Sequence, residues 1–151
     1  MITLYREEQV EGISLKLNIP KTVVKKMITG YIDYLNSQIR IGKTIKFLNL
    51  FYMVVSGYID TQETLAYTAH KVGEDYEISP VVAYSILEKY QEMIIEDLNS
   101  GFSYNIRGLA NLSVKDFGDR KSVSAKKSTV YNGYDIRISQ TRYLRNCLKE
   151  H

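Results

Sequence analysis

The residues of this chain with the clearest chemical potential are the lysines and arginines of its last quarter. Residues 115–151 hold nine basic residues and four acidic ones, whereas residues 1–114 hold 11 basic and 13 acidic ones. Such an asymmetry is typical of a protein that binds a polyanion, because lysine and arginine neutralise phosphate groups. A basic segment that is only a solvated surface gives the same pattern, so charge alone leaves both interpretations open.

Metal binding and catalysis find little support in the sequence. A zinc site needs about four Cys or His ligands at short spacing, but Cys147, His70 and His151 are scattered along the chain. The segment 41–44 resembles the end of a phosphate-binding loop, yet the required earlier glycine is replaced by Ser37. No serine lies in a nucleophile motif. We therefore predict no enzyme activity, no catalytic residue, no metal, no cofactor and no small-molecule substrate.

The composition is that of a globular protein. The chain has 151 residues, of which 44% are hydrophobic, enough for one ordinary domain or two small ones. No apolar run is long enough to span a membrane, and the first residues lack the order of a secretory signal. The single cysteine cannot form an internal disulfide, which fits a reducing compartment. These features predict a cytoplasmic protein with no membrane partner.

The elements that must position the basic residues occur twice. A shift of 59 positions places residues 24–55 on residues 83–114 without a gap. In both segments, helical spacing of apolar residues changes to a period near two at a glycine, Gly42 in the first and Gly101 in the second. This shared change of period indicates a duplicated helix-and-hairpin unit.

Local patterns predict the elements of each copy. Ser79 followed by Pro80 is a favoured helix start, and Asp60 or Thr61 is the expected cap of the preceding helix. The expected helices span residues 5–17, 21–40, 61–73, 80–99 and 141–149, and the expected strands span residues 44–48, 51–55, 102–106, 110–117 and 134–139. Residues 118–133 lack an apolar period, so we expect them to form a mobile basic arm that becomes ordered on a partner.

The order helix, helix, hairpin, basic arm, third strand and terminal helix resembles that of the HU and integration host factor family of DNA-bending proteins. The segment 98–114, Leu-Asn-Ser-Gly-Phe-Ser-Tyr-Asn-Ile-Arg-Gly-Leu-Ala-Asn-Leu-Ser-Val, is similar to the family's leucine, glycine, strand, turn and return strand. Residues 61–151 look like a complete copy, and residues 6–55 look like a truncated second copy. The resemblance implies a duplicated HU-like α+β fold, with a repeat over 1–57 that lacks an arm and a repeat over 58–151 with an arm at 118–133, joined as one intertwined unit.

The sequence departs from the family at two places. The aromatic-glycine pair of the turn is replaced by Leu109-Ala110, and the asparagine-proline pair of the arm tip falls on Thr129-Val130. In the family that proline is the wedge that kinks DNA, so its absence argues against strong bending. Val130 or Tyr131 is the candidate apolar wedge in its place.

The first functional hypothesis is a nucleoid-associated or transcription-associated protein that binds duplex DNA through phosphate contacts with weak sequence specificity. The resemblance also implies a location in the bacterial nucleoid or in phage-infected bacterial cytoplasm. The alternative is a protein-interaction factor in transcription or assembly that keeps the HU-like fold as a dimerisation scaffold. The candidate DNA-binding residues are Lys115, Arg120, Lys121, Lys126, Lys127, Val130, Tyr131, Arg137, Arg142 and Arg145.

The pairing of the two copies is the last expectation. The stripes on the helices 21–40 and 80–99 predict that the two copies pack against each other within one chain. Because the first copy lacks a third strand, its sheet is expected to keep a free edge, and a further homodimer is possible there.

Overall fold

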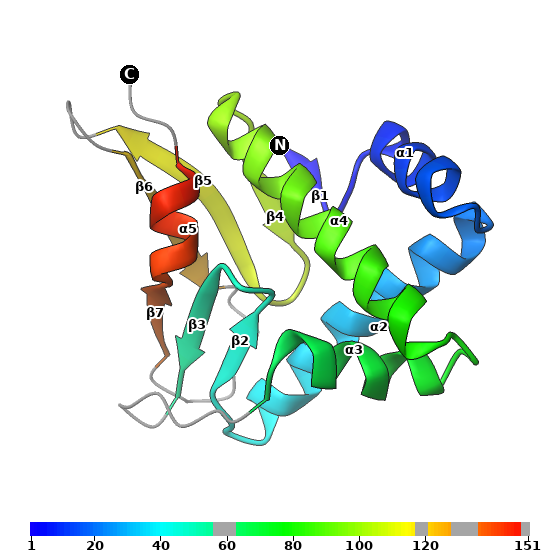
Figure 1. Ribbon diagram of the computed structural model, residues 1–151. Helices are drawn as coiled ribbons and strands as arrows, with labels where there is room; N and C mark the ends of the chain where they lie inside the picture. Colours follow the sequence, from blue (N-terminus) through cyan, green and yellow to red (C-terminus); the bar gives the residue numbers. More distant parts are fainter. Residues whose placement is uncertain (56–62, 117–120, 128–135, 149–151) are drawn as a thin grey trace.

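The computed structural model describes residues 1–55, 63–116, 121–127 and 136–148, and these residues form an α+β structure. Four helices pack on one side of the molecule, and most of the strands lie on the other side together with the short last helix (Figure 1). The helices are α1 (Glu7–Leu17), α2 (Lys21–Arg40), α3 (Leu65–Glu74), α4 (Pro80–Asn99) and α5 (Arg142–Cys147). The strands are β1 (Ile2–Thr3), β2 (Ile45–Phe47), β3 (Phe51–Val54), β4 (Tyr104–Ile106), β5 (Ala110–Asp116), β6 (Lys121–Lys127) and β7 (Arg137–Gln140).

The repeat predicted from the sequence has a counterpart in the element boundaries. The shift that carries residue 21 to residue 80 places α2 on α4 and β2 on β4 with identical bounds. Gly42 and Gly101 end the two long helices with φ angles of 83° and 92°, a region that glycine adopts without strain. Their backbone N–H groups donate to the carbonyl groups of Ile39 and Leu98 at 2.9 and 3.2 Å. The two segments therefore share local structure as well as sequence pattern.

The helix starts agree with the sequence in one case and correct it in another. Ser79 caps α4 as predicted, with its hydroxyl accepting from the N–H of Val82 at 3.3 Å. The preceding helix begins later than expected, at Leu65, because Thr64 accepts from the N–H of Tyr67 at 3.1 Å and serves as the cap. The predicted caps, Asp60 and Thr61, lie outside the described residues.

Helices from both halves share one hydrophobic core. Met27 and Ile28 of α2 and Ile86 and Leu87 of α4 are fully buried, and they belong to one continuous cluster. α4 packs against α1, α2 and α3 (Figure 1). The amphipathic stripes are therefore covered within the chain, as the sequence predicted.

The strand β6 corrects the prediction of a mobile arm. It pairs antiparallel with β5 along its whole length, from Lys121 opposite Asp116 to Lys127 opposite Ala110. Val123 and Ala125 lie opposite Val114 and Leu112 and pack against the core. These two small apolar side chains, together with the backbone pairing to β5, account for the order of this strand. The rest of the predicted arm lies outside the described residues.

The strand β7 corrects the predicted free edge of the first sheet. It pairs antiparallel with β3, with Ile138 opposite Met53. Thr141 anchors the end of β7: its N–H donates to the carbonyl of Leu50 at 2.9 Å and its hydroxyl donates to the carbonyl of Asn49 at 2.6 Å. The sheet orders are β2-β3-β7 and β1-β4-β5-β6. The chain's own last strand thus closes the sheet that the first copy leaves incomplete.

The short strand β1 was not predicted. It adds parallel to β4, and the segment after it is held by a polar cluster around Asp97, a residue only 4% exposed. The Arg6 guanidinium Nη2 donates to Asp97 Oδ1 at 2.8 Å, and Gln9 Nε2 donates to Asp97 Oδ2 at 2.6 Å. The Tyr104 hydroxyl also donates to Asp97. Because the buried carboxylate is paired and hydrogen-bonded, it fixes α1 and β4 to the end of α4.

Candidate nucleic-acid interface

The sheet β4-β5-β6 has a polar outward face. Side chains alternate along β5, where Leu112 is buried and its neighbours are exposed. The register places Lys115 opposite Ser122 and Lys126 opposite Asn111, so both lysines lie on this outward face. The other outward residues of these strands are Asn105, Ser113 and Ser124. The face therefore offers cationic, amide and hydroxyl donors.

The sheet β2-β3-β7 has an outward face of similar chemistry. Lys46 lies opposite Tyr52, and Tyr52 lies opposite Ser139. Arg137 is exposed at the start of β7. The Lys46 ammonium is 5.8 Å from the centroid of the Tyr52 ring, so positive charge and an aromatic ring are presented together.

The two sheets meet at β6 and β7 through one side chain. The Gln140 carbonyl oxygen accepts from the backbone N–H of Val123 at 3.1 Å and from the Ser122 hydroxyl at 3.1 Å. A side chain thus takes the place of a backbone ladder between the two edge strands.

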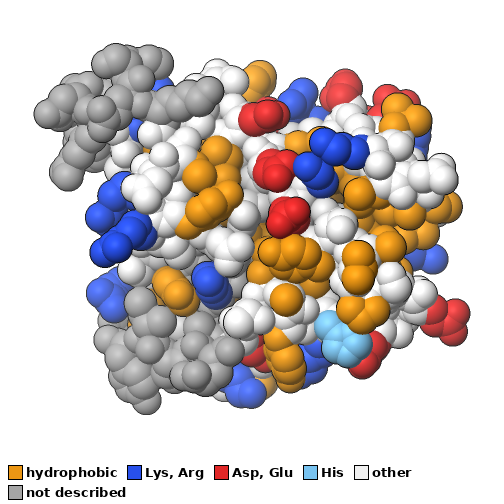
Figure 2. Space-filling view, in the orientation of Figure 1, with side chains coloured by type: hydrophobic (Ala, Val, Ile, Leu, Met, Phe, Trp, Pro, Cys, Tyr) orange, Lys and Arg blue, Asp and Glu red, His pale blue; other side chains and the backbone are white. Residues whose placement is uncertain are grey.

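Acidic residues are distributed differently from basic ones. Among the described strand residues Asp116, at the end of β5, is the one acid. The helices carry most of the acids, including Glu88, Glu92 and Glu96 of α4. Figure 2 shows acidic side chains along the middle of the view, over α4, and Lys and Arg side chains at the left, near α5 and β7. The strands are therefore predominantly basic, whereas the helices carry charges of both signs.

The structure brings together some of the predicted site residues and separates others. Lys115 and Lys126 share one face, whereas Lys121 and Lys127 lie on the opposite side of β6, toward its two ends. The other predicted residues are divided as follows: Arg137 on β7, Arg142 and Arg145 exposed on α5, and Arg120, Val130 and Tyr131 outside the described residues. The predicted basic cluster is thus spread over two sheets and a helix.

A groove of about 420 Å³ lies beside the outward face of the sheet β2-β3-β7. It is bordered by β2, β3, β7 and the first residues of α5, which lie side by side in Figure 1. Tyr143 is 44% exposed there, and partial burial raises the pKa of its hydroxyl. The lining residues are Lys46, Asn49, Tyr52, Ser139, Gln140, Thr141, Arg142 and Tyr143.

Sequence reasoning missed the contribution of the first half to this surface. Lys46 alternates with the buried Ile45 and Phe47, and Tyr52 alternates with the buried Phe51 and Met53. This period of two was the available signal, because it places Lys46 and Tyr52 on the side away from the core. Their proximity to α5 could not be seen, since it depends on β7 crossing to β3.

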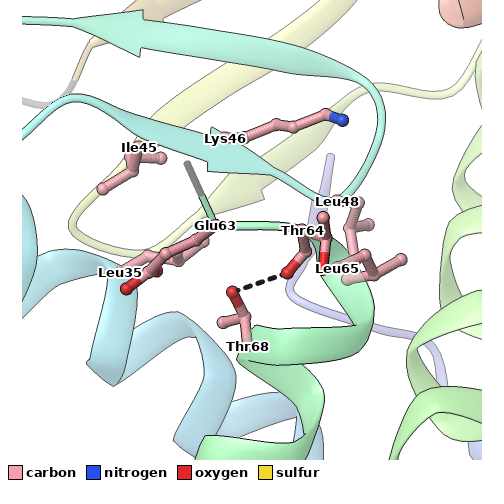
Figure 3. Close-up of a pocket in the computed structure, with 8 residues that line it drawn as sticks. All are labelled: Leu35, Ile45, Lys46, Leu48, Glu63, Thr64, Leu65 and Thr68. Carbon is pink, nitrogen blue, oxygen red and sulfur yellow. Dashed lines mark hydrogen bonds between the residues drawn. The ribbon is translucent and has the colours of Figure 1, made fainter. Parts of the chain in front are cut away.

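Two other concave sites lie beside α3. A cavity of about 10 Å³ between Leu35, Ile45 and Thr68 has room for about one water molecule. Figure 3 shows it beside the start of α3, where the Thr68 hydroxyl donates to the carbonyl of Thr64 at 3.0 Å, and shows Lys46 extending away from it. A wider groove between α2 and α3 is lined by Asp33, Glu74 and Asp75 with Lys71.

The described residues contain neither a cluster of three or more potential metal ligands nor a helix long and apolar enough to cross a membrane. The chain also stands apart in comparisons with known proteins: no protein-family model and no curated protein sequence matches it.

Proposed function

We propose that this protein binds double-stranded DNA through the outward faces of its two sheets, by phosphate contacts and with weak sequence specificity. The observation that carries the proposal is the charge of those faces. Among the side chains that the structure describes, the charged ones on these faces are Lys46, Lys115, Lys126 and Arg137, all of them basic. Hydroxyl and amide side chains fill the positions between, and these groups also donate to phosphate oxygens.

The arrangement of the fold supports an HU-like interpretation. Two helix-and-hairpin units of equal spacing share one core, and in each unit a third strand, β7 or β6, pairs antiparallel with the hairpin. In this interpretation the chain is a duplicated HU-like unit that pairs with itself. The missing proline argues against a strong kink, so we propose binding along the backbone rather than wedge-driven bending. A bacterial or phage-infected cytoplasm remains a prediction from the resemblance.

The proposed mechanism is neutralisation of phosphates. Each phosphate contact releases a condensed counterion, so log affinity falls with log salt by about 0.9 per contact. The helices α1–α4 carry nine acidic and seven basic residues, so they attract DNA less than the basic sheet faces do.

The test measures the affinity for duplex DNA at several salt concentrations for three variants, each with one pair of lysines replaced. We expect Lys115→Gln with Lys126→Gln to reduce the salt slope by about 1.8, because two phosphate contacts are lost. Lys25→Gln with Lys26→Gln on α2 is the distant control, and Lys121→Gln with Lys127→Gln is the control on the same strand but the other face.

Equal losses from the outward pair and from the α2 pair would contradict the assignment of the interface. No salt-sensitive binding by the folded wild-type protein would favour the alternative, a protein-interaction scaffold. Circular dichroism melts of each variant separate loss of binding from loss of fold.

A further inference from the structure

We propose that the groove between β3, β7 and α5 receives an unpaired nucleotide. This inference deepens the proposed function and rests on it for the placement of a nucleic-acid backbone along the sheet. The groove combines two cations, Lys46 and Arg142, with two partly exposed tyrosines, Tyr52 and Tyr143. Its volume of about 420 Å³ lies in the range of small-ligand sites, about 300–1,000 Å³.

The aromatic residues point to a base. A base and a tyrosine ring stack in a way that tolerates any sequence, because every base has a π-face. In a duplex those faces are covered by neighbouring base pairs, so only an unpaired base can use the groove. Tyr52 is held rigidly in the central strand of its sheet, which reduces the entropy lost when a base stacks on it.

The polar residues point to the sugar-phosphate part of a nucleotide. The Lys46 ammonium stands 5.8 Å from the centroid of the Tyr52 ring, close enough for a nucleotide to contact both. Within the described residues the side chains of Asn49 and Ser139 make no hydrogen bond, so both can bind a base edge or a sugar. Thr141 and Gln140 are already engaged, Thr141 with Asn49 and Leu50 and Gln140 with Ser122 and Val123, and they fix the shape of the groove.

The position of the groove explains how a strand reaches it. Arg137 and Ser139 lie on the outward side of β7, and β7 leads directly into the first residues of α5. A nucleic-acid strand that follows the cationic sheet face therefore passes the groove, and an unpaired base of that nucleic acid can enter it.

The test uses two probes, a short oligothymidylate and a fully paired duplex. We expect Tyr52→Ala with Tyr143→Ala to weaken oligothymidylate binding by at least about tenfold, because the loss of even one stacking contact has an effect of that size. The same variant should leave duplex affinity within a few-fold. Tyr52→Phe with Tyr143→Phe should keep oligothymidylate binding, and Tyr67→Ala, a tyrosine 51% exposed on α3, is the matched control.

A photocrosslink gives a second readout that does not depend on affinity. An oligothymidylate with one 5-iodouracil should crosslink to Tyr52 or Tyr143. The proposal is overturned if the alanine pair binds the oligothymidylate as wild type does, or if the crosslinks map to other residues. Failure of the proposed function is different: the paired duplex then does not bind, whatever the oligothymidylate does.

Discussion

The two sheets of this protein are built from equivalent hairpins but are completed in different ways. The sheet β4-β5-β6 takes its third strand from the segment that directly follows β5. The sheet β2-β3-β7 takes its third strand from near the end of the chain, after the whole second unit has been formed. Similar hairpins thus acquire an antiparallel partner strand either from the next segment of the chain or from a distant one, and the sheet of the second hairpin also includes the parallel strand β1.

The equivalent tyrosines of the two long helices show the same contrast on a smaller scale. Tyr31 and Tyr90 are both buried, and burial raises the pKa of each hydroxyl. Tyr31 accepts from the N–H of Leu48 at 2.7 Å and so holds its own hairpin turn. Tyr90 donates to the carbonyl of Leu4 at 2.6 Å and so holds the segment after β1. The tyrosines at equivalent positions of α2 and α4 thus stabilise different segments of the chain.

The largest expected effect tests whether the helical layer is equivalent in both halves. Leu35→Asp in α2 and Ile94→Asp in α4 each bury a charge in the shared core, and each should lower the free energy of unfolding by more than about 4 kcal/mol. Chemical denaturation measures the loss. Leu15→Asp at a position 82% exposed is the control. A folded, stable Leu35→Asp variant would refute the shared core.

The next effect tests how Thr141 anchors the strand β7 to the first hairpin. The Thr141 hydroxyl caps α5 by accepting from the N–H of Leu144, and it also donates to the turn after β2. Thr141→Ala removes both of these interactions. We expect a loss of about 2 kcal/mol, compared with about 1 kcal/mol for Ser79→Ala, which removes a cap alone. Equal losses would mean that Thr141 does not anchor β7.

A smaller effect separates the two tyrosines. Tyr31→Phe leaves the buried N–H of Leu48 without its acceptor and should cost about 1–2 kcal/mol. Tyr90→Phe should cost about 1 kcal/mol, because a carbonyl tolerates the loss of a donor better than an N–H tolerates the loss of its acceptor. Amide exchange should quicken at Leu48 in the first variant and at Ile2 in the second. The reverse pattern would contradict the assignment of tasks.

The smallest effect concerns the seam between the sheets. Gln140→Ala removes the acceptor of the Val123 N–H, but this edge is half-buried and water can replace it, so the cost should be about 0.5 kcal/mol. Faster amide exchange at Val123, with unchanged exchange at Leu112, is the expected signature. Unchanged exchange at Val123 would show that the seam is not held by Gln140.

The sequence predicted what depends on neighbouring residues and missed what depends on distant ones. The long helices, their glycine ends and the first hairpin follow from local period, and the observed bounds agree. Lys121–Lys127 was missed because its inward residues, Val123 and Ala125, are small, and only pairing with β5 makes it a strand. The partner of β7 could not be predicted, since both hairpins offered an apolar edge. For the same reason the basic residues were identified but their division between faces was not.

The crossing of β7 to β3 has a consequence for the order of folding. Thr141 and Asn49 are 92 residues apart in the sequence, yet their contact anchors the first sheet. During synthesis the hairpin β2-β3 is made first, and the edge of β3 stays unpaired until β7 has been made. Such non-local pairings slow folding, because the entropy of loop closure is lost before the contact forms. The nascent chain therefore carries an exposed edge on β3 until β7 has been made, and this is a stage at which it is open to aggregation.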